Sequence, residues 1–284
     1  MRAFISKTLF FFLLVFSTIL ILFVSICWYF GQKPFNKNPG RTVVFGDSRL
    51  EFLYNNKCNL AYNSEGPKFS YYKLVQLNKM NKIDTLFLGF AQHTLSSYFD
   101  EYNNNQVEVI PRYFTILPGK MNIITSYRLK NIPNLVKRQF DFAFGSLLHK
   151  NNFIVGGYDP SSNSRADSLH IVQRINYQYY DQSGIKPFCA TNLDYFSKIK
   201  QYCTDNHITL ILVATPVHKD YHRRIPAQYT DKYAEVTKGL HMLDISHICT
   251  EDTDFLLDGD HVSIQGSLKA TRYIDSLRAA WSSK

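Results

Sequence analysis

An uncharged apolar run near the N-terminus limits what this chain can fold into more than any other feature. The run extends from Thr8 to Phe30 and reads TLFFFLLVFSTILILFVSICWYF. Its roughly 23 residues exceed the ~20 that cross a bilayer as a helix, and a helix satisfies its own backbone groups in lipid. We therefore predict that residues 1–30 form a cytoplasmic tail and a transmembrane anchor in contact with membrane lipid.

Two other uses of the run are alternatives to this anchor. A cleaved signal peptide would have a shorter apolar region and a small-x-small cleavage pattern, whereas this run ends in Cys27, Trp28, Tyr29 and Phe30. A lipid-modified Cys27 would need a small residue before it, as in a lipobox, but Ile26 stands there. Both patterns favour the uncleaved, single-pass anchor.

The orientation of the anchor rests on its flanking charges and on the length of the tail. Positive residues flank the run almost equally. Single N-terminal anchors with a short tail export the bulk of their chain. We therefore predict an extracytoplasmic domain, either periplasmic or extracellular. The flanking residues are Arg2, Lys7, Lys33, Lys37 and Arg41.

The chain after the anchor has the composition of one folded domain. Its 284 residues are 45% hydrophobic and only 19% charged, which excludes a disordered chain. A polar Gly/Pro/Asn linker at 31–41 precedes the predicted domain at 42–284. The net charge of +9 fits an anionic glycan or lipid surface, but the scattered lysines and arginines favour a solvated basic surface. Without a nucleic-acid motif, nucleic acid is not a predicted partner.

The cysteines leave two possibilities open and argue against a third. Four of them lie outside the apolar run, so one or two disulfides or free buried thiols are both compatible with the sequence. There is no Cys/His cluster at zinc spacing, so we predict no metal site and no cofactor. The four are Cys58, Cys189, Cys203 and Cys249.

Short apolar segments alternate with helical patterns along the domain. Segments that are apolar on both faces are typical of a parallel sheet covered on both sides. We therefore predict an α/β fold, a three-layer α/β/α sandwich. The predicted strands are Thr42 to Phe45, Asn59 to Asn63, Thr85 to Phe90, Thr209 to Ala214 and His241 to Ile245. The predicted helices are Lys68 to Met80, Leu193 to Asp205 and Ile264 to Trp281.

One long segment interrupts this alternation. From Thr94 to Thr191 there is no clear strand, and we predict a helical insertion with helices at Ile123 to Val136 and Phe140 to His149. Long excursions between sheet strands often cap an active site. The alternative is a helical elaboration that packs elsewhere.

The strongest chemical signal is Gly46-Asp47-Ser48 directly after the first predicted strand. A serine there lies at the carboxyl end of a parallel strand, where open α/β sheets bind ligands. Its hydroxyl would be accessible to a base, and its amide would be a donor for a developing oxyanion. An ordinary N-cap serine is the alternative.

A second signal precedes the last predicted helix, in LLDGDHVSIQGS. Asp258 and His261 are three residues apart on a loop with a glycine, so the carboxylate can reach the imidazole. Such a carboxylate fixes the tautomer of a catalytic histidine and stabilises its protonated form. Asp260 adjoins the histidine directly and is the less suitable orienting group.

Together the two motifs resemble those of the SGNH/GDSL hydrolase family over residues 42–284. The resemblance implies a flavodoxin-like parallel sheet, with Ser48 as nucleophile, His261 as general base and acid, and Asp258 as its orienting carboxylate. The family's Gly-x-Asn-Asp block is altered here, which resembles divergent membrane-anchored members linked to D-alanylation and alginate acetylation. This implies a multi-span acyltransferase as a candidate partner.

The oxyanion hole is less clear from the sequence. The resemblance implies Gly66 as one donor, beside the amide of Ser48. Gln92 and His93 stand near the missing Asn and are candidate replacement donors. The loop after the fourth strand adds His218, Tyr221 and Arg223 as weaker substrate-binding candidates, with surface exposure as the alternative.

The sequence therefore predicts a serine-dependent esterase or O-acyltransferase. Its substrate would be an acyl ester of a cell-envelope glycan or lipid, with a polysaccharide as a candidate acceptor. The alternative is a non-catalytic envelope protein that keeps the fold and binds glycan or lipid. A Ser48 hydroxyl out of hydrogen-bond reach of His261 would favour that alternative.

Overall fold

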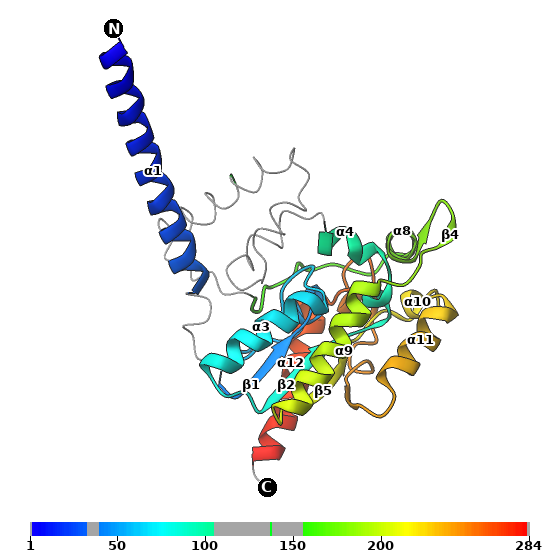
Figure 1. Cartoon of the computed structure of the whole chain (residues 1–284). Helices are drawn as coiled ribbons and strands as arrows, with labels where there is room; N and C mark the ends of the chain where they lie inside the picture. The colour runs from blue at the N-terminus through cyan, green and yellow to red at the C-terminus, as the bar shows by residue number, and fades with distance from the viewer. Residues whose placement is uncertain (1, 33–39, 105–136, 138–155, 283–284) are drawn as a thin grey trace.

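The computed structural model describes residues 2–32, 40–104, 137 and 156–282 (Figure 1). Its first element is the helix α1, Arg2–Gln32. Within it, the 22 residues Phe4–Ser25 have a mean hydropathy of 2.6, and none of this stretch is buried against the protein. The helix thus has the length and composition of a single membrane span, properties that a signal sequence near the N-terminus shares.

The centre of the domain is a four-stranded parallel sheet with the order β1-β2-β5-β6. Four of the five predicted strands are confirmed. The first three contain buried apolar residues, as a covered sheet requires, whereas the fourth lies at the sheet edge and is mostly exposed. The strands are β1 (Thr42–Phe45), β2 (Thr85–Gly89), β5 (Thr209–Ala214) and β6 (His241–Asp244).

The fifth predicted strand, Asn59 to Asn63, is not a regular strand. It makes one parallel bridge, between Val44 and Asn59, on the free edge of β1. Three backbone hydrogen bonds still follow a parallel ladder: Val44 N to Cys58 O at 2.9 Å, Leu60 N to Val44 O at 2.8 Å and Tyr62 N to Gly46 O at 2.9 Å. The Asn59 side chain instead donates to the carbonyls of Leu50 and Tyr54, which ties the segment to the preceding turn.

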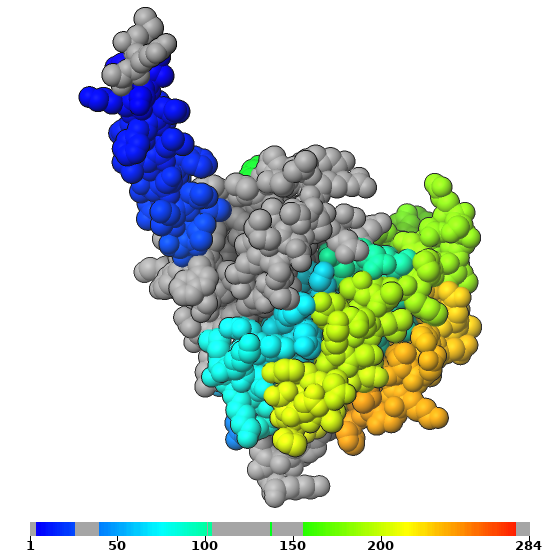
Figure 2. Space-filling view, in the orientation of Figure 1, coloured from blue at the N-terminus to red at the C-terminus, as the bar shows by residue number. Residues whose placement is uncertain are grey.

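Helices lie on both faces of the sheet because side chains alternate along each strand. Val43 and Phe45 of β1 pack with the helices α3 (Pro67–Met80) and α9 (Ala190–Asp205) on one face. Val44 packs on the other face in a cluster that includes α12 (Ile264–Ser282). In Figure 2, α3 and α9 form one continuous surface over their face. The three predicted helices therefore exist, with boundaries shifted by up to three residues.

Short elements connect the sheet to the helices. The predicted insertion between residues 94 and 191 contains helical elements and a small antiparallel hairpin in its described parts. The predicted helices Ile123 to Val136 and Phe140 to His149 lie outside the described residues. The remaining elements are α2 (Ser48–Glu51), η2 (Gln92–Leu95), α4 (Tyr98–Asn104), α8 (Ser168–Tyr179), β3 (Tyr180–Asp181), β4 (Gly184–Ile185), α10 (Lys219–His222), α11 (Ala227–Thr237) and η4 (Asp252–Asp254).

The cysteines outside α1 are free thiols buried in the core. Cys58, Cys189, Cys203 and Cys249 form no disulfide with one another. Burial raises the pKa of the Cys189, Cys203 and Cys249 thiols to about 12, so they stay protonated at neutral pH. Of the two possibilities left open by the sequence, the structure has the free buried thiols.

Candidate active site

The turn after β1 places Ser48 at the sheet edge. Gly46 has φ +154°, and a Cβ on it would lie 3.2 Å from the Cα of Gly89 at the end of β2. The two strand ends thus come together only because both residues lack a side chain. Asp47 then caps α2, its Oδ1 accepting from the Arg49 amide at 3.0 Å. Ser48 is the first helical residue and is 8% exposed.

A tight loop returns the chain to this turn before α12. Phe255 and Val262 form an antiparallel bridge, and the Leu256 amide donates to the His261 carbonyl at 2.9 Å. Gly259 supplies the left-handed residue of the loop, with φ +64°. The loop therefore brings the side chains of Asp258 and His261 into contact with each other.

Ser48, His261 and Asp258 form a continuous chain of hydrogen bonds. Ser48 Oγ lies 2.7 Å from His261 Nε2, and His261 Nδ1 lies 2.7 Å from Asp258 Oδ2. Asp258 Oδ1 accepts from the backbone amides of Asp260 and His261 at 3.0 and 3.2 Å, which fixes the carboxylate. The structure thus brings the three predicted catalytic residues together.

The protonation state of Asp258 follows from its surroundings. Burial raises the pKa of this carboxyl, but the neighbouring His261 and Arg174 lower the pKa by more than burial raises it. The pKa of Asp258 therefore lies below its ordinary value. Ionised Asp258 accepts a hydrogen from His261 Nδ1. Nε2 is then free to accept the Ser48 proton, which is the arrangement of a serine nucleophile and its general base.

Asp260 is held by a buried ionic network instead of by the histidine. Arg49 pairs with Asp260 Oδ1, and Nε of Arg174 donates to Oδ2 at 2.8 Å. Gln178 Nε2 donates to the same oxygen at 2.9 Å. Burial raises the pKa of Asp260, but the two guanidiniums outweigh it and hold the pKa well below its usual range. Tyr221 links Arg49 to Gln178 through its hydroxyl.

This network was not predicted from the sequence, although it joins four separate segments. Arg49 directly follows Ser48, Arg174 and Gln178 are on α8, Tyr221 is on α10, and Asp260 is beside His261. A signal was present, because Arg174 and Gln178 are spaced i, i+4 and therefore lie on one face of α8. The network fixes the position of the loop that carries Asp258 and His261 (the histidine loop) relative to the turn that carries Ser48.

A cavity of about 340 Å³ opens in front of Ser48 and His261. Its walls combine aromatic rings with a larger number of polar and charged side chains. Phe52 lies beside His261, with ring centroids 5.5 Å apart. The lining residues are Asp47, Ser48, Phe52, Asn63, Ser64, His93, Tyr98, Phe99, Tyr102, Arg174 and His261.

His93 lines this cavity but its one N–H is engaged. Its Nε2 lies 2.5 Å from Asp47 Oδ2. Burial and the charge of Arg49 lower the pKa of His93, and the pKa of Asp47 is also lowered, because His93 and Arg49 outweigh its burial. A neutral ring beside an ionised carboxylate donates its single hydrogen to Asp47. In this protonation state His93 therefore offers no donor to an oxyanion.

The other two predicted oxyanion donors lie outside the cavity lining. Gly66 is the N-cap of α3, where a Cβ would lie 3.0 Å from Asn192 Oδ1. Gln92 faces a different cavity, described below. Asn63 and Ser64, just before Gly66, do line the pocket of Ser48. The sequence pointed to the right segment but not to its two pocket residues.

The three weaker substrate-binding candidates also lie away from this cavity. His218 caps α10 by accepting from the Asp220 amide at 3.2 Å. Tyr221 is fully buried in the Arg49 network. Arg223 is exposed and pairs with Asp220 at 3.2 Å.

Asp258, Asp260 and His261 also present ligand atoms within 4.8 Å of one another, as a metal site would. Each of these atoms already has a partner, however. Asp260 is neutralised by two guanidiniums, and Asp258 and His261 bond to each other. The donor set therefore suits proton transfer better than metal coordination.

Comparison with models of known protein families gave no match, and comparison with curated proteins found no significantly similar relative.

Proposed function

We propose that this protein is a serine esterase or O-acyltransferase of the SGNH type, anchored in the membrane by α1. The observation that carries the proposal is the hydrogen-bond chain from Ser48 through His261 to Asp258, with both distances at 2.7 Å. This contact is the one that a non-catalytic member of the fold would lack. The serine also lies in a cavity large enough for a small ester.

The arrangement of the sheet supports the same family. With the Cys58 to Tyr62 segment counted as an edge strand beside β1, the strand order in sequence is 2-1-3-4-5. That order is flavodoxin-like, and ligands bind where it changes direction, at the carboxyl end of the first strand. Ser48 follows that strand. Helices on the two faces of the sheet support the three-layer α/β/α arrangement that we propose.

The proposed reaction has two steps. His261 Nε2 takes the proton of Ser48 as Oγ attacks the ester carbonyl, and the resulting imidazolium is stabilised by Asp258. Collapse of the tetrahedral intermediate breaks the ester bond, and His261 returns the proton to the leaving alcohol. Water or a glycan hydroxyl then attacks the acyl-enzyme by the same sequence in reverse, which gives hydrolysis or transfer.

Two donors in the cavity suit the oxyanion. The Ser48 amide starts α2 and has no acceptor among the described residues. Asn63 lines the cavity, and its Nδ2 has no partner in this part of the chain either, while its Oδ1 accepts from Ser64. We propose these two groups as the oxyanion hole. The Asn63→Asp variant keeps the shape but removes the donor, so it should lower kcat about 100-fold or more.

The test uses the full chain in detergent and an activated acetyl ester. Acetate release should disappear in Ser48→Ala and in His261→Ala. The surface variants Ser276→Ala and His241→Ala are matched controls that should keep the wild-type rate. Equal turnover in all four variants would remove the triad from consideration. Mass analysis of added oligosaccharides for an acyl adduct then distinguishes transfer from hydrolysis.

The cellular setting is part of the same proposal. A periplasmic or extracellular domain would meet acyl esters of envelope glycans or lipids. A multi-span acyltransferase is the proposed source of acyl groups for the transfer reaction. Protease added to intact cells should cleave the domain if it lies outside the cytoplasmic membrane.

A further inference from the structure

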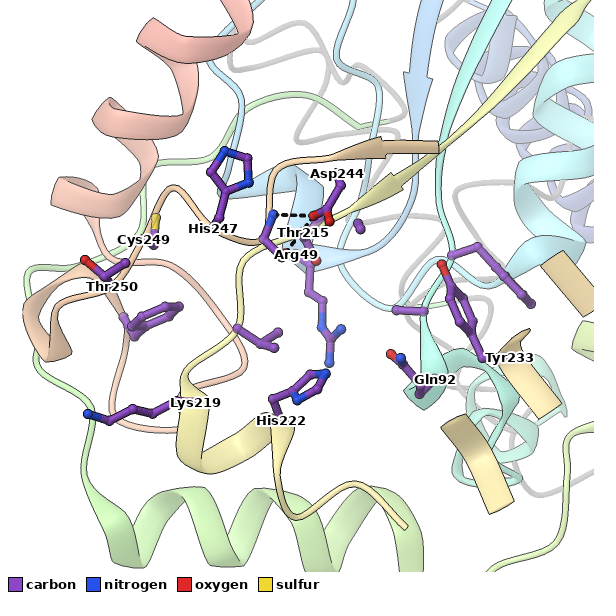
Figure 3. Close-up of a pocket in the computed structure, with 16 residues that line it drawn as sticks. Arg49, Gln92, Thr215, Lys219, His222, Tyr233, Asp244, His247, Cys249 and Thr250 are labelled. Carbon is purple, nitrogen blue, oxygen red and sulfur yellow. Dashed lines mark hydrogen bonds between the residues drawn. The ribbon is translucent and has the colours of Figure 1, made fainter. Parts of the chain in front are cut away.

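A second cavity, of about 520 Å³, lies beyond the carboxyl ends of β2, β5 and β6 (Figure 3). Its volume falls within the range of roughly 300 to 1,000 Å³ that is typical of ligand pockets. No residue lines both cavities. Residues adjacent in sequence face different cavities: Ser48 lines the catalytic cavity and Arg49 this one, and His93 lines the catalytic cavity and Gln92 this one.

Arg49 gives this second cavity a buried positive charge. The side chain is 5% exposed, and its Nε and Nη2 are bound by Asp260 and Tyr221. Its Nη1 has no partner among the described residues, and the guanidinium extends into the cavity between Gln92 and His222 (Figure 3). Asp260 is shared with Arg174, whose Nε also lies 3.9 Å from Asp258 Oδ2.

Further donors surround the guanidinium. The Thr215 hydroxyl, the Gln92 amide, the Lys219 ammonium and the His222 ring line the cavity, and their side chains have no hydrogen-bond partner in the described part of the chain. The single lining carboxylate is Asp244. Its Oδ1 is engaged by the amide and the hydroxyl of Ser246, at 2.9 and 2.6 Å. Donors therefore outnumber free acceptors.

We propose that this cavity binds the phosphate or carboxylate group of a small organic molecule. The Arg49 guanidinium lines the cavity, where a ligand oxygen can supply the acceptor that the described residues do not give to Nη1. The planar guanidinium of arginine and the ammonium of lysine both bind phosphate and carboxylate oxygens through short, charge-assisted hydrogen bonds. The cavity exceeds the size of an inorganic anion, so there is room for the rest of the ligand beside Tyr233 and Phe90.

The site is distinct from the acyl chemistry, and its test does not depend on that chemistry. Isothermal titration calorimetry on the full chain in detergent measures the binding of inorganic phosphate and, separately, of citrate. Binding should be saturable for at least one of them, which also tells phosphoryl from carboxylate recognition. The Lys219→Ala/His222→Ala variant should weaken it roughly tenfold or more, because an ammonium and an imidazole donor are lost.

Two controls locate the binding. Lys238→Ala/His241→Ala removes the same residue types from exposed positions outside both cavities, and Ser48→Ala alters the catalytic cavity only. Both should bind like the wild type. The proposal fails if neither probe binds saturably, or if the Lys219→Ala/His222→Ala variant binds as tightly as the wild type. It also fails if Ser48→Ala abolishes binding.

Discussion

Neighbouring aspartates in the histidine loop should respond to the same substitution in opposite ways. Asp260 is 1% exposed and pairs with Arg49 and Arg174, which are 5% and 24% exposed. The Asp260→Asn variant keeps the shape but leaves Arg49 without its paired carboxylate and Arg174 with only the more distant Asp258, at 3.9 Å. Breaking a buried ion pair from one side costs about 3–5 kcal/mol. At about 2–4 °C per kcal/mol for a domain of this size, the melting temperature should fall by roughly 10 °C.

Asp258→Asn, two positions earlier in the same loop, is the matched control. Asp258 is 26% exposed and its principal side-chain partner is His261. The amide oxygen still accepts from the backbone, so the loss in stability should be near the ~1 kcal/mol of one hydrogen bond. The amide nitrogen, however, faces Nδ1 and favours the wrong tautomer of His261. The rate should therefore fall about 1,000-fold or more.

Differential scanning calorimetry and acetyl-ester turnover on the two variants separate these effects. Asp260→Asn should melt early, and below its own melting temperature it should retain more activity than Asp258→Asn. If Asp260→Asn melts within 2 °C of the wild type, the ionic network does not hold the loop as the geometry implies. A melting temperature lowered equally in both variants would contradict the division of roles between the two carboxylates.

Three further outcomes follow from the structure. Folding lowers the pKa of His93, Asp47 and Asp260, so each group stabilises the fold fully above its unfolded pKa, near 6.5 for the histidine and 3.9 for the aspartates, and loses this contribution as pH falls. The urea midpoint should therefore drop from about pH 6 downward, and steeply below pH 4. A midpoint that rises on acidification would oppose this. Gly46→Ala should cost more than about 1 kcal/mol and most of the activity, because its φ is +154° and the new Cβ would press on β2; urea unfolding and ester turnover measure both. Leu14→Arg with Ile19→Arg should release the chain from carbonate-washed membranes, since each arginine adds roughly 2.5–3.5 kcal/mol to insertion; retention would argue against α1 as the anchor.

The sequence was sufficient where the deciding interactions are local. The apolar run of α1 and the strands β1, β2, β5 and β6 follow from residue patterns that each segment carries within itself. The Asp258 and His261 pair is also local, since a three-residue spacing across a glycine turn brings the carboxylate to the ring. The edge segment after β1 was misjudged because the Asn59 side chain competes with the strand ladder, which no apolar pattern reports.

The tertiary structure decided what depends on segments far apart in the chain. It set the distance between Ser48 and His261, gave the free buried thiols, and turned Asp260 toward Arg49 and Arg174. It also sent Gln92 and His93, adjacent in sequence, into different cavities. The physical reason is that packing around the sheet, and not sequence spacing, fixes which distant donors and acceptors meet. The sequence by itself thus determined the apolar helix α1, four of the strands and the pairing of Asp258 with His261, whereas only the fold decided the buried charges around them.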